Sequence, residues 1–273
     1  MPLLASTKRA EFRKLHEGGC FVLPNPWDVG SALALQSLGF KALASTSAGL
    51  AWSLGRADNS ITRDEVLAHL KAVADRTDIP LNADFENGFA HDPDGVAANV
   101  TAAVETGIAG LSIEDSTGDA AATLYAFDLA VARIAAARTA IDRSGADVVL
   151  TARSEGFIAG RPDLAETIRR LRAFSDAGAD CLYAPGLRED DQIRAIVAAA
   201  ASKPVNVLTL GRPVAELAAL GARRISVGGA LARAAWGGFL AAARQIATDG
   251  VFDALARATP GGELNRLFSA PVN

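Results

Sequence analysis

The sequence predicts an α/β protein that folds as a (β/α)8 barrel of the TIM type. Eight short apolar runs recur along the 273 residues, and each is followed by a polar tip and then by an alanine-rich helical stretch. The runs are continuously apolar rather than alternating, which is typical of parallel strands covered on both faces. A chain of about 250 residues is an ordinary length for one such barrel.

The eight expected strands are residues 20–24 ("CFVLP"), 41–46 ("KALAST"), 80–84 ("PLNAD"), 110–115 ("GLSIED"), 147–153 ("DVVLTAR"), 180–185 ("DCLYAP"), 204–210 ("PVNVLTL") and 223–229 ("RRISVGG"). The glycines expected to end the helices before four of these strands are Gly39, Gly107, Gly178 and Gly221. Glycine is common at that position because it accepts the left-handed backbone conformation. The spacing of Thr62 and Glu65 matches a capping box at a helix start. A doubly wound open sheet is the alternative, but the segment "PNPWDVGSA" after the first strand lacks its glycine-rich fingerprint.

We expect one domain over residues 1–273, with a helical extension that begins at about residue 229. Within this extension Trp236, Phe239 and Leu240 form an apolar stripe at helical spacing. The stripe is expected to pack against a barrel, either its own or that of another subunit, rather than to form a free binding face.

Composition excludes several classes of function. The net charge of −4 and the absence of a basic run argue against a nucleic-acid partner. Cys20 and Cys181 lie far apart without CxxC spacing, so neither a disulfide framework nor a structural zinc site is expected. The first residues are too charged for a signal peptide, and no apolar run approaches the roughly 20 residues that span a bilayer. A cytoplasmic protein without a membrane partner is therefore expected.

Polar side chains gather where the expected strands end, which is the end of such barrels that carries the chemistry. These residues are Asn25, Trp27 and Asp28, then Ser45–Gly49, Asp84 and Glu86, Glu114 and Asp115, Arg153 and Glu155, Tyr183, and Asn206. The many acidic groups around one arginine would repel one another without a cation. Oxygen donors without histidine favour Mg²⁺ or Mn²⁺ over zinc. The alternative is that Asp84 and Glu86 only favour the start of the next helix.

Five segments together resemble the isocitrate lyase/phosphoenolpyruvate mutase superfamily. They are "STSAGLAWSLGRAD" (45–58), "ADFENGF" (83–89), "SIED" (112–115), "TARSEGF" (151–157) and "PVNV" (204–207). The family pattern at the third strand is D-x-D-x-G-x-G. In this chain Glu86 replaces the second aspartate and Ala90 replaces the last glycine.

The resemblance implies site roles that we take as expectations. Mg²⁺, or alternatively Mn²⁺, would lie near Asp84, Glu86 and Glu114 and would bind the oxygens of a small 2-oxo or 2-hydroxy carboxylate. The substrate-binding residues would be Ser45, Ser47, Ala48, Gly49, Asp84, Arg153 and Asn206. The residues closest to the reaction would be Asp58, Glu114 and Arg153. Arginine suits such a site because it binds a carboxylate bidentately and stays charged. The alternative for Arg153 is a structural ion pair with Glu155 or Glu114.

The segment after the fourth strand departs from the family. Lyases of this family carry K-K-C-G-H there, whereas residues 114–128 read "EDSTGDAAATLYAFD", without Cys, Lys or His. Tyr125 is a candidate proton donor or, alternatively, a packing residue. Small residues and glycine suit a mobile lid.

The leading interpretation is a Mg²⁺-dependent lyase that cleaves or forms a C–C bond in a small 2-oxo or 2-hydroxy dicarboxylic acid through an enolate, a charge that a divalent cation stabilises. Oxaloacetate decarboxylation or hydrolysis is the nearest variant. Two further hypotheses are a phosphate site at Gly228–Gly229 before the last helix and a non-catalytic binder of 2-oxo acids. The resemblance also implies a homodimer or homotetramer in which the last barrel helix is exchanged between subunits.

Overall fold

The computed structural model describes residues 3–269, and eight parallel strands form its centre. They are β1 (Phe21–Leu23), β2 (Leu43–Ala44), β3 (Leu81–Asp84), β4 (Gly110–Glu114), β5 (Val149–Arg153), β6 (Cys181–Tyr183), β7 (Val205–Leu208) and β8 (Arg224–Ser226). The strand order β1-β8-β7-β6-β5-β4-β3-β2 runs around the barrel. The remaining gap between β1 and β2 is bridged by a hydrogen bond from Ala44 N to Pro24 O at 3.0 Å. The predicted (β/α)8 barrel is confirmed.

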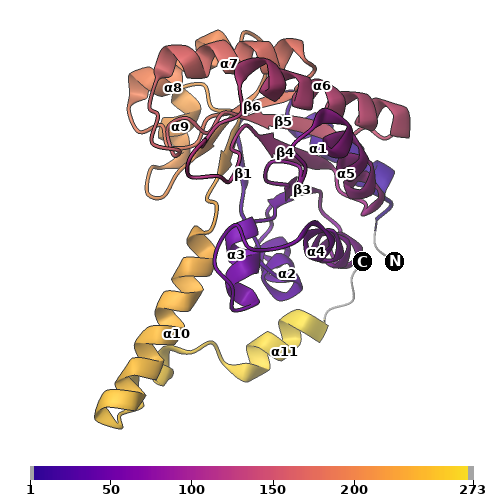
Figure 1. Ribbon diagram of the computed structural model, residues 1–273. Helices are drawn as coiled ribbons and strands as arrows, with labels where there is room; N and C mark the ends of the chain where they lie inside the picture. Colours follow the sequence, from indigo (N-terminus) through magenta and orange to yellow (C-terminus); the bar gives the residue numbers. More distant parts are fainter. Residues whose placement is uncertain (1–2, 270–273) are drawn as a thin grey trace.

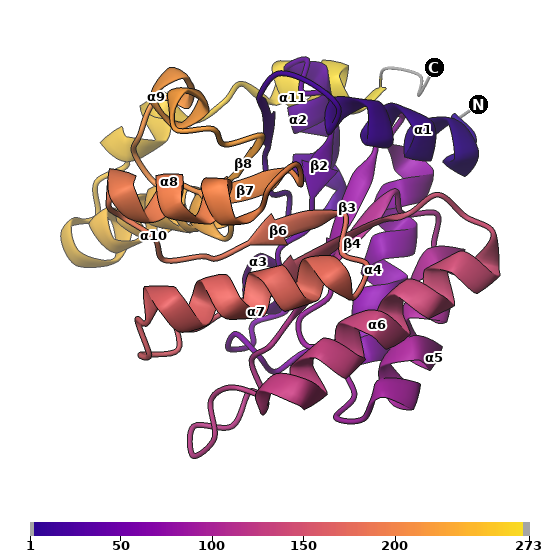
Figure 2. The ribbon, with the colours of Figure 1, turned by 90° about the horizontal axis from the view of Figure 1, so that it is seen from above.

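Helices surround the strands (Figure 2). They are α1 (Ala5–Leu15), α2 (Val29–Ser37), α3 (Ser47–Ser53), α4 (Arg63–Arg76), α5 (Pro93–Glu105), α6 (Phe127–Ser144), α7 (Leu164–Asp176), α8 (Asp190–Ala199) and α9 (Val214–Ala219). The Thr62–Glu65 capping box starts α4 as expected. Gly39, Gly107, Gly178 and Gly221 all have positive φ, between 86° and 103°, which confirms their predicted role at helix ends.

Helix α1 closes the amino-terminal end of the barrel. The Phe12 side chain is fully buried and packs with residues from several strands, including Leu23 and Val149. Gly110 makes room for it, because a Cβ there would lie 2.6 Å from Phe12 Cε1. With this end filled by an aromatic ring, the opposite end of the barrel is left for a binding site.

The C-terminal elements leave the barrel. Helix α10 (Ala230–Asp249) extends away from the strands, η1 (Asp253–Arg257) follows, and α11 (Gly261–Ser269) turns back toward α2 (Figure 1). Trp236, Phe239 and Leu240 are 38%, 60% and 39% exposed. The stripe is therefore only partly covered in the single chain, where Trp236 and Phe239 share a cavity with Trp27 and Ser53, and its packing against a barrel stays a prediction. Within residues 3–269, none of the helices has the length and apolar character needed to cross a membrane.

Candidate active site

The end of β3 presents two carboxylates through an unusual backbone turn. Asp84 is the last residue of the strand, and Glu86 follows with φ of 46°, in the left-handed region that non-glycine residues rarely adopt. The turn is held against the neighbouring strand because Glu114 N donates to Glu86 O at 3.0 Å. Strained backbone of this kind gathers at functional sites. Here it places the Glu86 side chain at the mouth of the barrel, beside Asp84.

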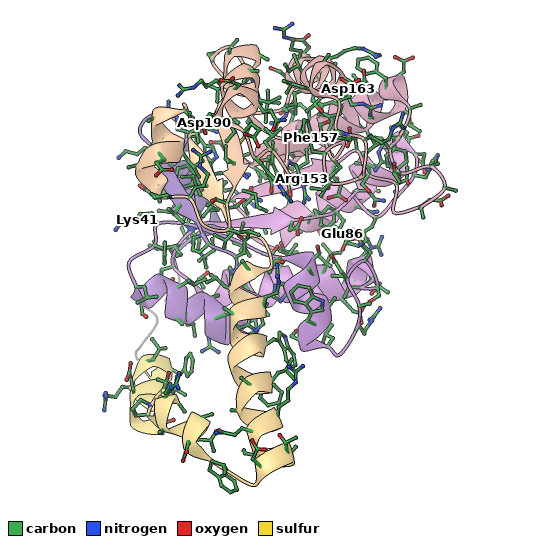
Figure 3. All side chains as sticks on the ribbon, turned by 90° about the vertical axis from the view of Figure 1, so that its left-hand side faces the viewer. Lys41, Glu86, Arg153, Phe157, Asp163 and Asp190 are labelled. Carbon is green, nitrogen blue, oxygen red and sulfur yellow. The ribbon has the colours of Figure 1, made fainter. Side chains whose placement is uncertain are left out.

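Arg153, the last residue of β5, binds three carboxylates at once. Nη1 lies 2.7 Å from Asp84 Oδ1, Nη2 lies 3.1 Å from Glu114 Oε2, and Nε lies 3.0 Å from Glu155 Oε1. Figure 3 labels Arg153 and Glu86 in the region of the strands. These ion pairs match the alternative considered for Arg153, although the same guanidinium also lines two cavities.

The site holds more negative than positive charge. Four carboxylates, Asp84, Glu86, Glu114 and Glu155, accompany the single guanidinium of Arg153. Burial, together with the charges of Asp84 and Asp58, raises the pKa of Glu86 to about 7. Burial also raises the pKa of Glu114, which Arg153 only partly offsets. Burial lowers the pKa of Arg153, but the acids around it outweigh this effect and raise its pKa well above the usual value.

The donor set fits a divalent cation. Glu86 Oε1 is buried and has no hydrogen-bond partner among the described residues, and a buried carboxylate oxygen without a partner is costly unless a proton or cation satisfies it. No three His, Cys, Asp or Glu side chains between residues 3 and 269 converge as a ready-made metal cluster. The reason is visible in the ion pairs, since Arg153 draws Asp84 and Glu114 toward itself. A cation would compete with Arg153 for these oxygens.

The segment after β2 packs directly against Asp84. Ser47 donates to Asp84 Oδ2 from both its backbone N and its Oγ, each at 3.0 Å, and the buried Ser45 accepts from Asp84 N at 2.8 Å. A Cβ on Gly49 would lie 2.6 Å from Thr46 Cγ2, so glycine is required for this close approach. Ala48, the neighbouring residue, lies beside Gly229. The predicted substrate-binding residues after β2 are therefore next to the predicted metal ligands.

Two cavities meet at Arg153. The outer one has a volume of about 200 Å³, and its lining includes Ser47, Asp58, Glu86, Glu114, Arg153 and Glu155. The inner one, of about 80 Å³, reaches into the barrel, and its lining includes Ser45, Asp84, Arg153, Asn206, Arg224 and Ser226. All the residues predicted for metal, catalysis or substrate, apart from Ala48 and Gly49, therefore line one of the two cavities. Asp58 is an exposed residue at the rim of the outer one.

Specific contacts bear on two further expectations, the phosphate site at Gly228–Gly229 and the role of Tyr125. The backbone N–H groups of Val227 and Gly228 both donate to Asn25 Oδ1, at 3.0 and 2.9 Å. Because these groups are already occupied, the geometry argues against the phosphate site at Gly228–Gly229. Tyr125 is buried, and Cζ of the Arg133 guanidinium lies 3.9 Å from the centroid of the Tyr125 ring. This position supports a packing role rather than proton donation.

The segment between β4 and α6 is a short hairpin tied down at its base. Ser116 and Leu124 form an antiparallel bridge, and the tip of the segment between them is exposed. The buried Asp115 anchors the base, because it accepts from Glu155 N at 2.7 Å and pairs with Arg170 Nη1 at 3.1 Å. A firm base with an exposed tip of small residues, Gly118 to Ala122, is consistent with a lid over the outer cavity.

Sequence reasoning missed four polar residues of the inner cavity, Asn82, Ser112, Arg224 and Ser226. Arg224 and Ser226 alternate along β8, so both side chains can face the barrel interior. The alternation of Arg224 and Ser226 within "RRISVGG" indicates that the two side chains share one face of the strand, but it does not indicate whether that face is buried.

Comparison with known proteins gives consistent similarities. The sequence model of the family described as phosphoenolpyruvate phosphomutase matches residues 12–247. A crystal structure from Burkholderia cenocepacia J2315, provisionally assigned as a lyase/mutase, has 48% identity and a TM-score of 0.96 over 98% of this chain and 99% of its own. An uncharacterized Mycobacterium tuberculosis (strain ATCC 25618 / H37Rv) protein is 34% identical and covers 91% of this chain and 92% of its own length.

A relative with an assigned activity also matches over most of the barrel. The oxaloacetate decarboxylase of Paraburkholderia xenovorans (strain LB400) is 30% identical over 81% of this chain and 75% of its own length. The activities named among the matching proteins include those of lyases, a decarboxylase, a hydrolase and mutases.

Proposed function

The chain belongs to the phosphoenolpyruvate phosphomutase family, within the isocitrate lyase/PEP mutase superfamily, and from that premise we propose that it is a divalent-metal-dependent lyase. Its substrate would be a small 2-oxo or 2-hydroxy dicarboxylic acid, and the reaction would cleave or form a C–C bond. Mg²⁺ is the proposed metal, with Mn²⁺ as the alternative, because all the donors are carboxylate oxygens.

One observation carries this proposal: an excess of partly or fully buried carboxylates surrounds a single guanidinium at the mouth of the barrel. Asp84, Glu86 and Glu114 would hold the cation, and the unpartnered Glu86 Oε1 is the atom with most to gain from it. When bound, the cation would stabilise the negative charge of an enolate. Active sites of TIM barrels lie at this end of the strands.

The chain's own residues would bind and orient the acid. With Asp84 and Glu114 holding a cation, the Arg153 guanidinium would be free to bind a substrate carboxylate bidentately. Ser47 lines the same outer cavity as Arg153, and its backbone N–H and hydroxyl, which both donate to Asp84 Oδ2, would hold that carboxylate in place beside the acid. Asp58 at the rim is placed to accept or supply a proton at the outer cavity.

Oxaloacetate decarboxylation or hydrolysis is the variant that the lid favours. The described hairpin between Ser116 and Leu124 has no cysteine, lysine or histidine. Decarboxylation needs an enolate-stabilising site but no specialised acid on the lid. The similarity to the Paraburkholderia xenovorans enzyme supports the same choice. Binding without turnover is the outcome that would instead make the protein a 2-oxo acid binder.

We also propose that the chain forms a homodimer or homotetramer through α10. Helix α10 leaves its own barrel with only Ala232 buried, and an apolar stripe of this kind normally packs against another surface. Light scattering of the wild-type protein and of the Phe239→Glu variant tests the assembly. A monomeric wild-type protein would contradict it.

Turnover of an acid panel tests the activity. The panel holds oxaloacetate, isocitrate, methylisocitrate, citramalate and phosphonopyruvate, each with Mg²⁺ and with EDTA. We expect metal-dependent release of pyruvate, glyoxylate or succinate, and loss of at least roughly 100-fold in Asp84→Ala, the size seen when one transition-state stabiliser is removed. Asp75→Ala is the matched control, because Asp75 forms an exposed ion pair with Lys71 on α4. Turnover that persists in EDTA and in Asp84→Ala would contradict the proposal.

A further inference from the structure

Arg224 is a buried cation at the floor of the inner cavity. Its side chain lies inside the barrel, and only 2% of the residue is exposed. No Asp or Glu oxygen between residues 3 and 269 lies within ion-pair distance of it. A buried charge is normally paired, because an uncompensated one is strongly destabilising.

Neutral groups accept hydrogen bonds from only some of the N–H donors of the Arg224 guanidinium. Nε donates to Asn206 Oδ1 at 2.8 Å, and Nη1 lies 3.3 Å from Asn82 Oδ1 and 3.4 Å from His16 Nε2. For Nη2 there is no hydrogen-bond partner within the described residues. An arginine carries five N–H donors and no acceptor, so this cation has hydrogen-bonding capacity left over.

The contact with Asn206 fixes the direction of a second donor. Because Asn206 Oδ1 accepts from Arg224, its amide nitrogen must face the other way, where it donates to Ser226 Oγ at 3.0 Å. The second N–H of that amide remains available, and Asn206 lines the same cavity. The floor of the inner cavity therefore presents donors and one unpaired positive charge.

The volume of this cavity suits a small anion. A single water needs about 10–15 Å³ of such space, and the inner cavity measures about 80 Å³. Arg153 lines both cavities, so an acid whose first carboxylate lies at Arg153 can direct a second group toward Arg224.

We propose that Arg224 is a specificity residue that binds the distal carboxylate of a dicarboxylic substrate, with Asn206 held in place beside it. The inference rests on the proposed function, since it takes Arg153 and the metal ligands as the site for the other end of the acid. It adds a physical reason for choosing a dianion over a monocarboxylate: the second negative charge compensates a cation that the protein leaves unpaired.

Matched ligands and matched variants test this assignment. Lactate and malate, each as both enantiomers, share the 2-hydroxy acid group and differ in the distal carboxylate. Their affinities for the Mg²⁺-loaded full chain are measured by calorimetry for wild type, Arg224→Gln, Arg224→Lys and Arg223→Gln. Arg223 is the control, because it is the adjacent arginine but donates to Gly19 O outside the barrel.

Wild type should prefer malate over lactate at least tenfold, which corresponds to about 1.4 kcal/mol. Arg224→Gln should reduce this preference below threefold by weakening malate alone, Arg224→Lys should retain part of it, and Arg223→Gln should leave it unchanged. A folded Arg224→Gln protein that keeps the tenfold preference overturns the assignment. Equal binding of both acids by wild type overturns it too while leaving the proposed function standing, whereas binding of neither contradicts both.

A second variant covers the case in which Arg224→Gln does not fold. Asn206→Asp places a carboxylate 2.8 Å from Arg224 Nε, at the position of the present Asn206 oxygen. It should raise or preserve the melting temperature, because the cation gains a partner, and it should abolish the preference for malate. Retention of that preference in Asn206→Asp overturns the assignment.

Discussion

Replacing Glu86 by glutamine separates the two roles of this residue, as a buried charge in the metal-free protein and as a metal ligand. Glutamine keeps the shape of the side chain and removes its ionisation. The pKa of Glu86 rises from 4.5 to about 7 on folding, mainly through burial. Between these values the folded protein binds a proton that the unfolded chain has released. The stability that the wild type has below pH 4.5 is therefore lost as the pH rises toward 7.

The size of this effect follows from the shift. At about 1.4 kcal/mol per pKa unit, the rise to about 7 corresponds to at most about 3 kcal/mol of lost stability. In EDTA, Glu86→Gln should therefore be more stable than wild type by up to about 3 kcal/mol at pH 8, and the difference should nearly vanish at pH 4.5. With saturating Mg²⁺ the stability difference between Glu86→Gln and wild type should narrow or change sign. A ligand that binds only the folded state stabilises the protein that binds it, and the wild type keeps the Glu86 carboxylate.

Urea unfolding of wild type and Glu86→Gln measures the difference in their free energies of unfolding under four conditions: at pH 4.5 and at pH 8, each with EDTA and with Mg²⁺. Glu105→Gln is the matched control, since Glu105 is an exposed residue near the end of α5. A Glu86→Gln protein that is less stable than wild type at pH 8 in EDTA, or that gains as much from Mg²⁺, would refute the reasoning.

Three more predictions concern individual buried residues. Gly49→Ala should destabilise by about 1–3 kcal/mol in urea and weaken acid binding, because its Cβ would overlap Thr46 Cγ2 at 2.6 Å; unchanged stability would contradict it. Asp115→Ala should lower the free energy of unfolding in urea by about 1–3 kcal/mol, because it leaves the buried Glu155 N–H without its acceptor and removes one of the two carboxylates paired with Arg170, which keeps Glu166; an unchanged free energy of unfolding would contradict it. Burial lowers the pKa of His16 to about 3 and of His69 to about 4, so the unfolded chain takes up their protons first as the pH falls below about 6.5. Stability should decrease over that range, by up to about 1.4 kcal/mol per pH unit for each histidine, and His69→Gln should flatten the profile measured by melting temperature.

The barrel could be predicted because its signals are local. Continuous apolar runs and glycine helix ends depend on neighbouring residues, and all eight expected strands are present. The strands are shorter than the expected apolar runs, and the reasons also lie in neighbouring residues. Pro24, for example, has no N–H with which to extend β1, and the chain turns into α3 directly after the two residues of β2.

The arginine at the floor of the inner cavity and the surface on which α10 packs could not be predicted, because both depend on distant contacts. Arg224 meets His16 and Asn82 across 208 and 142 residues of sequence, and nothing in "RRISVGG" distinguishes a buried arginine from an exposed one. The stripe on α10 indicates an apolar face but not the surface that it packs on. The carboxylates of β3, β4 and β5 were predictable as a group, since the ends of adjacent parallel strands meet at one edge.

The central claim is that Asp84, Glu86 and Glu114 hold a divalent cation beside Arg153. Anomalous diffraction from crystals of the full chain grown with Mn²⁺ and oxalate tests it most directly. We predict one strong peak between these three carboxylates, with oxalate bound to the metal and Arg153 turned toward the oxalate. The absence of a peak there at saturating Mn²⁺, with Arg153 still paired to Asp84 and Glu114, would contradict the account.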